Sequence, residues 1–177
     1  MSATRVFASI LFVLTIGFAW GMIVADYLIN DRPVKDSPAL SERPQPQPYF
    51  LPLEFASDVI YYCDEQGVPV WLACRLFDRE AWFNPHPRPS SAGALGMGQF
   101  MPSNLEPFSK AYNDGVPIDL NDHRAVIRVA IRHLGDLYRR LGSWDRAVGA
   151  YNAGPNLNPH YWPDETVRYV RYIVEGR

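Results

Sequence analysis

The stretch Trp71–Glu80 reads WLACRLFDRE, and its pattern decides how this chain folds. Its apolar residues Ala73, Leu76 and Phe77 lie three and four positions apart, which predicts the inner face of a helix. Glu80 continues the same face, whereas the other charged residues of the stretch fall on the opposite side. We therefore expect a core helix that carries one carboxyl group on its apolar face.

The carboxyl group of Glu80 is expected near the C-terminal end of that helix, because Asn84-Pro85 follows and the residue before a proline disfavours helical geometry. Burial and the negative end of the helix dipole both disfavour the charged form, so its pKa should be raised. A carboxylic acid that stays protonated near neutral pH can serve as a general acid. The structural alternative is a glutamate at the edge of the core, bonded to a backbone group or to Arg79.

From Leu51 onward the remaining sequence also reads as helical, without convincing strand alternation. Asp122 is the expected cap of the longest helix, and a short helix or turn broken by Pro102 and Pro107 is expected over 97–108. The other helices are expected over 53–66, 70–82, 123–141, 144–153 and 165–174. The prediction is a small all-α domain over residues 51–177.

Residues 1–50 differ from the rest in composition, with an apolar segment followed by a proline-rich one. Residues 6–25 are almost wholly apolar, which is enough to span a bilayer and longer than the apolar part of a usual signal peptide. Segment 1–28 is therefore expected to be an uncleaved anchor, with a cleaved signal peptide as the alternative. Arg5 favours an orientation that places the rest of the chain outside the cytoplasm, in the periplasm or cell envelope. Segment 29–50 is rich in proline and predicts a semi-rigid spacer.

Composition excludes several classes of function. A formal charge of −2 gives no electrostatic case for binding nucleic acid. The four histidines lack metal-ligand spacing, so no metal site is expected. The order of Gly93, Gly96 and Gly98 does not match a nucleotide-binding motif, and no cofactor is expected. The row Arg124, Arg128 and Arg132 is interpreted as a solvated helix face. Cys63 and Cys74 lie on neighbouring helices, and the sequence leaves open whether they form a disulfide.

Four motifs in order resemble the soluble lytic transglycosylase family. They are Glu80–Pro85 (EAWFNP), Gly93–Pro102 (GALGMGQFMP), Ala150–Pro155 (AYNAGP) and the segment ETVRYV that begins at Glu165. The resemblance covers roughly residues 53–173. Each motif alone is a weak signal, but four at suitable spacing form a specific one.

The resemblance implies a lysozyme-like α fold that cleaves the β-1,4 bond between N-acetylmuramic acid and N-acetylglucosamine in peptidoglycan glycan strands. It implies that Glu80 protonates the glycosidic oxygen and then takes the proton of the muramic acid C6 hydroxyl, which closes a 1,6-anhydro ring. Most glycosidases need two carboxylates, and no second acid occurs here in a comparable motif. Two alternatives stay open: a lysozyme-like hydrolase that uses water, and an inactive module that only binds peptidoglycan.

The resemblance also implies roles for residues around Glu80. Gln99 corresponds to a glutamine that bonds the glycan, and Tyr151 to a tyrosine whose hydroxyl approaches the catalytic glutamate. Asn152 would bond either the glycan or the backbone. Tyr169 would either close the floor of the cleft or pack between helices.

The remaining site residues depart from the family pattern or match it ambiguously. Ser90 and Ser91 both lie where the family often has a groove serine, in a loop one residue longer than usual, so the sequence does not decide between them. Ala81 stands where a serine usually follows the glutamate. Gly98 stands where methionine is common. None of these changes removes the acid, so activity is expected.

Overall fold

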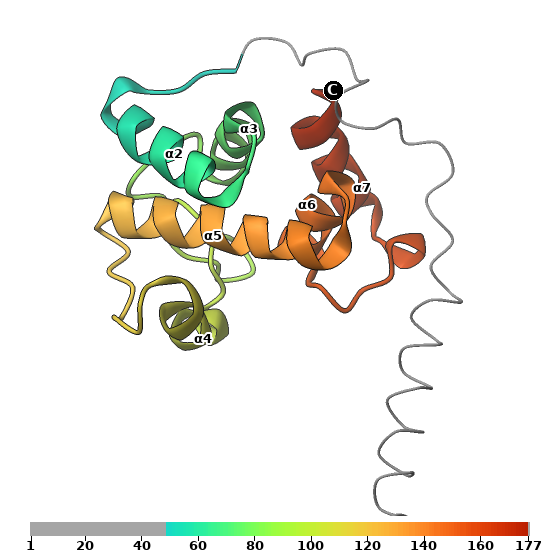
Figure 1. The fold of residues 1–177 in the computed structure, drawn as a ribbon. Coiled ribbons are helices and arrows are strands. Elements are labelled where there is room, and N and C mark those ends of the chain that lie inside the picture. Colours follow the sequence, from blue (N-terminus) through green and yellow to red (C-terminus); the bar gives the residue numbers. More distant parts are fainter. Residues whose placement is uncertain (1–48, 177) are drawn as a thin grey trace, which may run out of the picture. The chain divides into compact units, whose positions relative to one another are not determined.

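The computed structural model describes residues 49–176, which form a helical unit (Figure 1). This confirms the prediction of an all-α fold; within these residues the only extended pairing is an isolated bridge between Leu95 and Phe100. Among residues 49–176, none of the helices combines the length and the hydropathy that a membrane span requires. The expected anchor over 1–28 lies outside the described residues, as does the expected spacer over 29–50 apart from its last two positions. Both stay predictions.

Eight helical segments follow one another along the described chain. Helices α2, α5 and α6 have the predicted ends, and α3 stops one residue earlier than expected. The C-terminal helix divides into α7 and a short π-helical continuation, η3. The bounds are Leu53–Gln66 (α2), Val70–Ala81 (α3), Pro102–Tyr112 (α4), His123–Leu141 (α5), Trp144–Ala153 (α6), Pro159–Tyr161 (η2, a 3-10 turn), Asp164–Val170 (α7) and Arg171–Glu175 (η3).

Helix α5 is the central element, and it packs against α2, α4 and α6 (Figure 1). Asp122 caps its first turn as predicted, because the side-chain Oδ1 accepts hydrogen bonds from the backbone N–H groups of Arg124 and Ala125. At its other end, Gly142 has a φ of +70°, a conformation that glycine adopts without strain. The buried face of α5 includes Ile127, Ile131 and Leu134. The long helix therefore forms the floor on which the shorter helices are placed.

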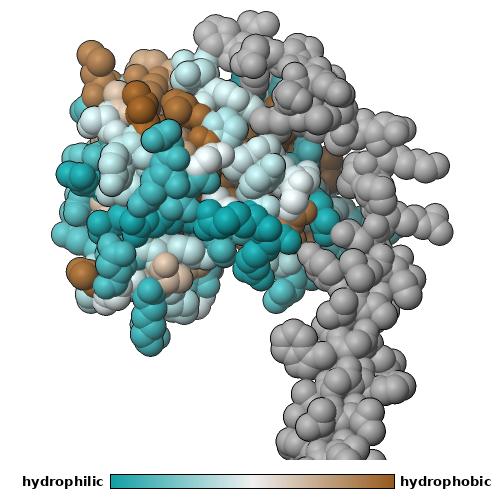
Figure 2. All heavy atoms as spheres, in the orientation of Figure 1, coloured by the Kyte–Doolittle hydropathy of each residue, from teal (hydrophilic) through white to brown (hydrophobic). Residues whose placement is uncertain are grey.

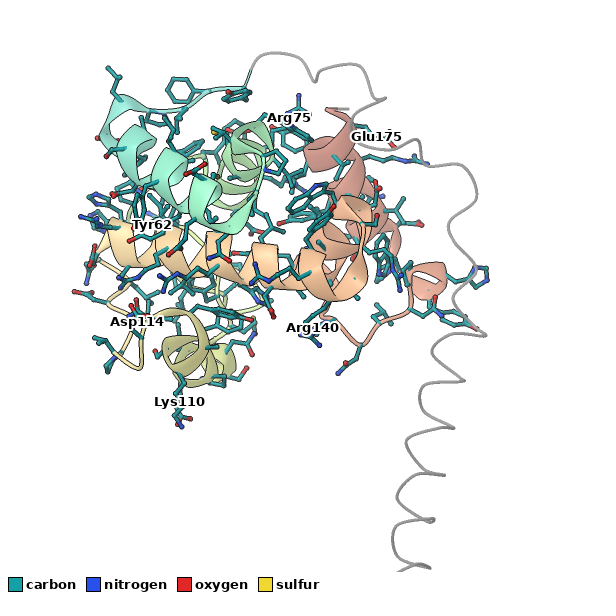
Figure 3. All side chains as sticks on the ribbon, in the orientation of Figure 1. Tyr62, Arg75, Lys110, Asp114, Arg140 and Glu175 are labelled. Atoms are coloured by element: carbon teal, nitrogen blue, oxygen red, sulfur yellow. The ribbon has the colours of Figure 1, made fainter. Side chains whose placement is uncertain are left out.

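The interpretation of the arginine row on α5 as a solvated face holds for Arg124, whose side chain is 64% exposed, and is wrong for Arg128 and Arg132. Arg132 is only 22% exposed, and its guanidinium group lies 2.9 Å from Glu65 of α2 and 3.2 Å from Asp114. Arg128 donates a hydrogen bond to Asn113. Figure 3 shows Asp114 on the side of α5 that faces α4, and Tyr62 between α5 and α2. The row fastens α5 to its neighbours, because acids distant in sequence fold back onto it.

The predicted break over 97–108 is also wrong. Helix α4 begins at Pro102 and continues through Pro107 to Tyr112. A proline at the first helical position loses no hydrogen bond, since that N–H has no partner inside the helix. Pro107 removes a donor for the carbonyl of Ser103, but Ser103 is exposed and water can satisfy that carbonyl.

The two cysteines of the chain lie in the core. Cys63 and Cys74 are buried free thiols, and burial raises the pKa of each to about 12. The disulfide that the sequence left open is therefore not formed in this structure.

Figure 2 shows apolar side chains gathering near the start of α2, where Phe50 and Leu53 are exposed.

Candidate active site

Glu80 lies in the last turn of α3, as the helical pattern predicts. Its side chain is partly buried, and the pKa of its carboxyl group is raised to about 7, chiefly by burial. Two weaker effects oppose that rise: a hydrogen bond from Tyr169 and the positive charge of Arg79. The expected raised pKa is confirmed. At neutral pH this carboxyl group can both give and receive a proton.

Tyr169 of α7 lies directly against the acid. Its hydroxyl donates a hydrogen bond to Oε1 of Glu80. The pKa of Tyr169 is raised well above its usual value by burial and by the nearby carboxylate, so the hydroxyl remains protonated and acts only as the donor toward Glu80. The two residues are 89 positions apart, and α6 and α7 bring them together.

Tyr151 of α6 lies near Glu80, but its hydroxyl bonds another group. Its hydroxyl donates to the backbone carbonyl of Gly98 at 2.9 Å instead of to the acid. The charge of Glu80 still raises the pKa of Tyr151, after burial, so the two groups are close enough to interact. Tyr151 therefore fixes the Gly98 turn beside Glu80, while Tyr169 holds the carboxyl group itself.

Gln99 lies in a tight turn that the Leu95–Phe100 bridge closes with two backbone hydrogen bonds of 2.9 Å. Its backbone has a φ of +49°, which is uncommon for a residue other than glycine. Its side-chain Nε2 donates to the carbonyl of Gly96 at 3.0 Å. The amide oxygen of Gln99 and the second hydrogen of its Nε2 therefore remain for a ligand.

Gly98 is required by the packing of the same turn. A Cβ atom at this position would lie 2.5 Å from Cζ of Phe100. The Phe100 ring thus occupies the space that a side chain at position 98 would need, and it packs edge-on against Phe108 with ring centroids 5.6 Å apart. The departure from the family pattern at Gly98 is accommodated by Phe100.

Asn152 and Thr166 connect α6 to α7. The hydroxyl of Thr166 donates to Oδ1 of Asn152 at 2.7 Å, so the amide oxygen bonds a side chain instead of the backbone. The indole of Trp162 lies against Gly149, where a Cβ would be 2.1 Å from the ring. These contacts hold α7 on α6, and they set the position of Tyr169.

The two candidate serines have different surroundings. The hydroxyl of Ser90 accepts a hydrogen bond from the backbone of Ala94 at 3.0 Å, and its carbonyl accepts from Gly93 at 2.9 Å. Ser90 thus stabilises the loop 90–94 by hydrogen bonds within that loop. Ser91 is exposed, and within the described residues it has no hydrogen bond. The Ser91 hydroxyl is the freer of the two for a ligand.

His133 is a site neighbour that the sequence analysis missed, because it considered histidines only as metal ligands. Its ring packs against Tyr151 with centroids 5.4 Å apart, and its Nδ1 lies 3.3 Å from the hydroxyl of Tyr112. That hydroxyl donates to Asp136 at 3.1 Å, so it can accept from His133. Burial lowers the pKa of His133 to about 4, and the ring is neutral at pH 7. No spacing in the sequence sets His133 apart from its neighbours on α5, so only the packing identifies it.

Within residues 49–176, no second acid acts on Glu80. The effects on its pKa come from burial, Tyr169 and Arg79, and none comes from another carboxylate. The same residues contain no group of three histidine, cysteine, aspartate or glutamate side chains that could hold a metal ion. The arrangement is one partly buried acid, oriented by a tyrosine, beside a turn whose polar side chain, Gln99, is half-buried.

Comparison with known proteins gives a family and a fold. The family model described as "Transglycosylase SLT domain" matches residues 59–161. The structure of an inactive mutant of the lytic transglycosylase Slt from Pseudomonas aeruginosa is similar with a TM-score of 0.56 and 22% identity. The 70 kDa soluble lytic transglycosylase SLT70 from Escherichia coli is similar with a TM-score of 0.58 and 24% identity. Each similarity covers 69% of this chain but only 23% of the other. No curated protein sequence matches the chain.

Proposed function

We infer, because this chain belongs to the transglycosylase SLT domain family, that it is a lytic transglycosylase that cleaves peptidoglycan with Glu80 as its only catalytic carboxyl group. The observation that carries this proposal is the state of Glu80: a pKa of about 7, a hydrogen bond from Tyr169, and no second carboxylate acting on it in the described part of the chain. A pair of carboxylates is the usual requirement for glycoside cleavage. A single acid suits a reaction in which the substrate supplies its own nucleophile.

The proposed reaction proceeds in two proton transfers at the same carboxyl group. Protonated Glu80 gives its proton to the glycosidic oxygen as the bond from that oxygen to C1 of N-acetylmuramic acid breaks. The carboxylate then takes the proton of the C6 hydroxyl, whose oxygen bonds to C1 and closes the 1,6-anhydro ring. No water is consumed, and Glu80 ends protonated for the next turnover. A pKa near the working pH suits both transfers.

The tyrosines support this cycle by holding the acid and the turn in place. The Tyr169 hydroxyl stabilises the carboxylate that forms after the first transfer, since its hydrogen bond lowers the pKa of Glu80. Tyr151 holds the carbonyl of Gly98 and thereby the turn that carries Gln99. We assign Tyr169 as a positioning residue for the acid.

The glycan would contact the polar groups beside Glu80. The amide oxygen of Gln99 can accept a hydrogen bond from a sugar hydroxyl or acetamide N–H, while its Nε2 donates to Gly96 and orients the amide. The exposed hydroxyl of Ser91 and the amide of Asn152 are further proposed contacts. Ala81 is buried, so we assign it no direct contact with the glycan.

The test is digestion of purified sacculi by the full-length chain, followed by mass spectrometry of the fragments. Fragments with 1,6-anhydro ends support the proposal. Reducing ends would mean a lysozyme-like hydrolase that uses water, and intact sacculi with retained binding would mean an inactive binding module. The Glu80→Gln variant should bind sacculi without cutting them. Cutting at a normal rate by that variant would overturn the assignment of Glu80.

The cellular setting is proposed from the sequence of segment 1–28. We expect this segment to anchor the chain in the inner membrane and to place the catalytic unit in the periplasm, where peptidoglycan lies. Fractionation of cells that express the full chain, with and without residues 1–28, checks this. Recovery of the full chain in the cytoplasmic fraction would contradict it.

A further inference from the structure

The turn 95–100, which carries Gln99, is held by side chains from two helices outside it. The hydroxyl of Tyr151 on α6 donates a hydrogen bond to a backbone carbonyl of the turn at 2.9 Å. Phe100, the last residue of the turn, packs edge-on against Phe108 of α4, with ring centroids 5.6 Å apart. The turn is therefore fixed by one polar contact from α6 and one aromatic contact from α4.

Both of these supports pack on the same residue, His133 of α5. The centroid of its ring lies 5.4 Å from that of Tyr151 and 4.5 Å from that of Phe108. The His133 ring is tilted by 44° to the first and by 41° to the second, so each neighbour meets it at an angle. One side chain of the central helix thus contacts both side chains that hold the turn 95–100.

The orientation of the His133 ring is fixed by a chain of hydrogen bonds. Its Nδ1 lies 3.3 Å from the hydroxyl of Tyr112, and that hydroxyl donates to Asp136 at 3.1 Å. A tyrosine hydroxyl has one proton, so toward His133 it accepts, and Nδ1 is the nitrogen that carries a hydrogen. The Tyr112 ring also packs on His133, with centroids 5.3 Å apart. The ring of His133 therefore cannot turn away from its neighbours without breaking this chain.

We propose that His133 is a positioning residue, which sets the turn 95–100 and thereby the amide of Gln99 for contact with the glycan. It acts through Tyr151 on one side of the turn and through Phe108 on the other. The contact of Gln99 with the glycan rests on the proposed function. The control of the turn by His133 rests on the packing alone, so the two parts can be tested separately.

Hydrogen exchange in the full-length chain tests the control of the turn. The backbone N–H groups of Leu95, Gln99 and Phe100 each donate within the turn at 2.9 Å, so their exchange reports how often the turn opens. His133→Leu fills the space without a flat ring or an Nδ1 donor, and it should speed this exchange about tenfold through two lost ring contacts. His133→Phe keeps a ring and should stay within about twofold of wild type. Unchanged exchange in His133→Leu would overturn the proposal.

A matched control comes from another aromatic contact between α5 and α6. Tyr138 of α5 stacks on Trp144, the first residue of α6, with ring centroids 4.0 Å apart. Tyr138→Leu therefore also removes an aromatic contact between these helices, but it should leave exchange in the turn unchanged. An equal rise in Tyr138→Leu and His133→Leu would mean that the turn responds to any loosening of α5 against α6, and it would overturn the proposal.

A second variant approaches the turn from its other support. Phe108→Leu removes the ring that joins His133 to Phe100, so it should speed exchange in the turn as His133→Leu does. Melting curves check that both variants are folded. If His133→Leu folds poorly, Phe108→Leu decides, and wild-type exchange in that variant would overturn the proposal.

A double-mutant cycle connects the turn to the glycan. In full-length Glu80→Gln, binding of soluble glycan strands is measured with Gln99→Ala, with His133→Leu and with both changes. If His133 acts through Gln99, the combined variant should bind no more weakly than Gln99→Ala alone, at about a tenfold loss. Losses that multiply would mean that the two residues act independently, and the positioning role would be overturned.

The two measurements separate this proposal from the proposed function. If Glu80→Gln does not bind glycan strands but His133→Leu speeds exchange in the turn, the proposed function is contradicted and the control of the turn by His133 is supported. If His133→Leu speeds exchange in the turn and glycan binding stays at the level of Glu80→Gln alone, the turn does not govern that binding. That result would overturn His133 as a positioning residue for Gln99.

Discussion

At the scale of single residues, the acidity of Glu80 results from opposing local effects. Burial raises its pKa, while the hydrogen bond from Tyr169 and the charge of Arg79 lower it. The balance lies at about 7, where the acid and its conjugate base are both populated. An acid that must serve first as proton donor and then as acceptor benefits from that balance, because neither form is strongly favoured.

The Tyr169→Phe variant tests this balance. Removing the hydroxyl removes an effect that lowers the pKa of Glu80, so the pKa should rise further above 7. The fall of kcat/KM at high pH, which marks loss of the proton, should move to higher pH by about one unit. The rate should also fall, on the order of tenfold, because the carboxyl group is less well oriented. A pH profile on sacculi measures both effects, and an unmoved high-pH limb would contradict the role given to Tyr169.

Trp82 gives a prediction about stability. It follows α3 with a φ of +54° and is 84% exposed, so a bulky residue adopts a left-handed backbone with little burial in return. Glycine adopts this conformation without that strain, and Trp82→Gly should raise the free energy of unfolding by about 0.5–1 kcal/mol. Denaturant unfolding measures the change. Tyr161→Gly, at another exposed aromatic residue that lacks a positive φ, should not stabilise. A clear loss of stability in Trp82→Gly would contradict the inference that the backbone of Trp82 is strained.

The sequence predicted the acid and not its immediate partner. Glu80 stands out because it interrupts an apolar helical face, which is a local signal. The contact with Tyr169 depends on how α6 and α7 fold back, and no local pattern encodes that distance. The same reason explains why the hydrogen bond from Tyr151 to Gly98, 53 positions away in sequence, was not predicted. Residue types were predictable, and pairings between such distant positions were not.

At the scale of elements, helix ends were predictable where a cap or a glycine marks them. Asp122 and Gly142 bound α5 because a side-chain acceptor and a left-handed glycine satisfy the unpaired backbone groups at its ends. The expectation that prolines break the helix was wrong at α4, since Pro102 starts the helix and Pro107 lies on an exposed turn of it. At α4 the cost of Pro107 is reduced because the carbonyl that loses its donor, that of Ser103, is exposed to water.

The arginines of α5 give the prediction at this scale. Arg132 joins α5 to α2 through two hydrogen bonds to Glu65, of 2.9 and 3.0 Å, and bonds the carbonyl of Tyr112 at 3.1 Å. Arg132→Gln should lower the free energy of unfolding by about 1–2 kcal/mol, because these partly buried acceptors lose a charged donor. Arg140→Gln, at a side chain 56% exposed, should change it by less than about 0.5 kcal/mol. Equal effects in urea titrations would contradict the bracing role of Arg132.

At the scale of the whole described unit, the site is assembled from three parts of the chain by one long helix. Helix α5 supports α2 and α6, and α6 in turn holds α7. The carboxyl group comes from α3, its tyrosine partner from α7, and the bordering turn precedes α4. The order of the four motifs predicted the family, but the central role of α5 follows from packing, which no motif contains.

Two buried groups make the stability of this unit depend on pH in opposite ways. Glu80 has its pKa raised from 4.5 to about 7, so the folded state holds a proton that the unfolded state has lost, and stability falls as pH rises through this window. His133 has its pKa lowered from 6.5 to about 4, so the unfolded state holds the extra proton, and stability rises with pH between these two values. Where the two windows overlap, the two effects largely cancel.

The Glu80→Gln variant should remove that cancellation. Its glutamine can still accept the hydrogen bond of Tyr169 and does not titrate, so the contribution of His133 alone should make the variant gain stability as pH rises from 4.5 to 6.5. Relative to wild type, the gain should reach on the order of 1–3 kcal/mol by about pH 8 and change little above it. Urea unfolding of both proteins from about pH 4 to about pH 8 measures this difference. A difference independent of pH would mean that the folded state does not raise the pKa of Glu80, and the single-acid mechanism would lose its physical basis.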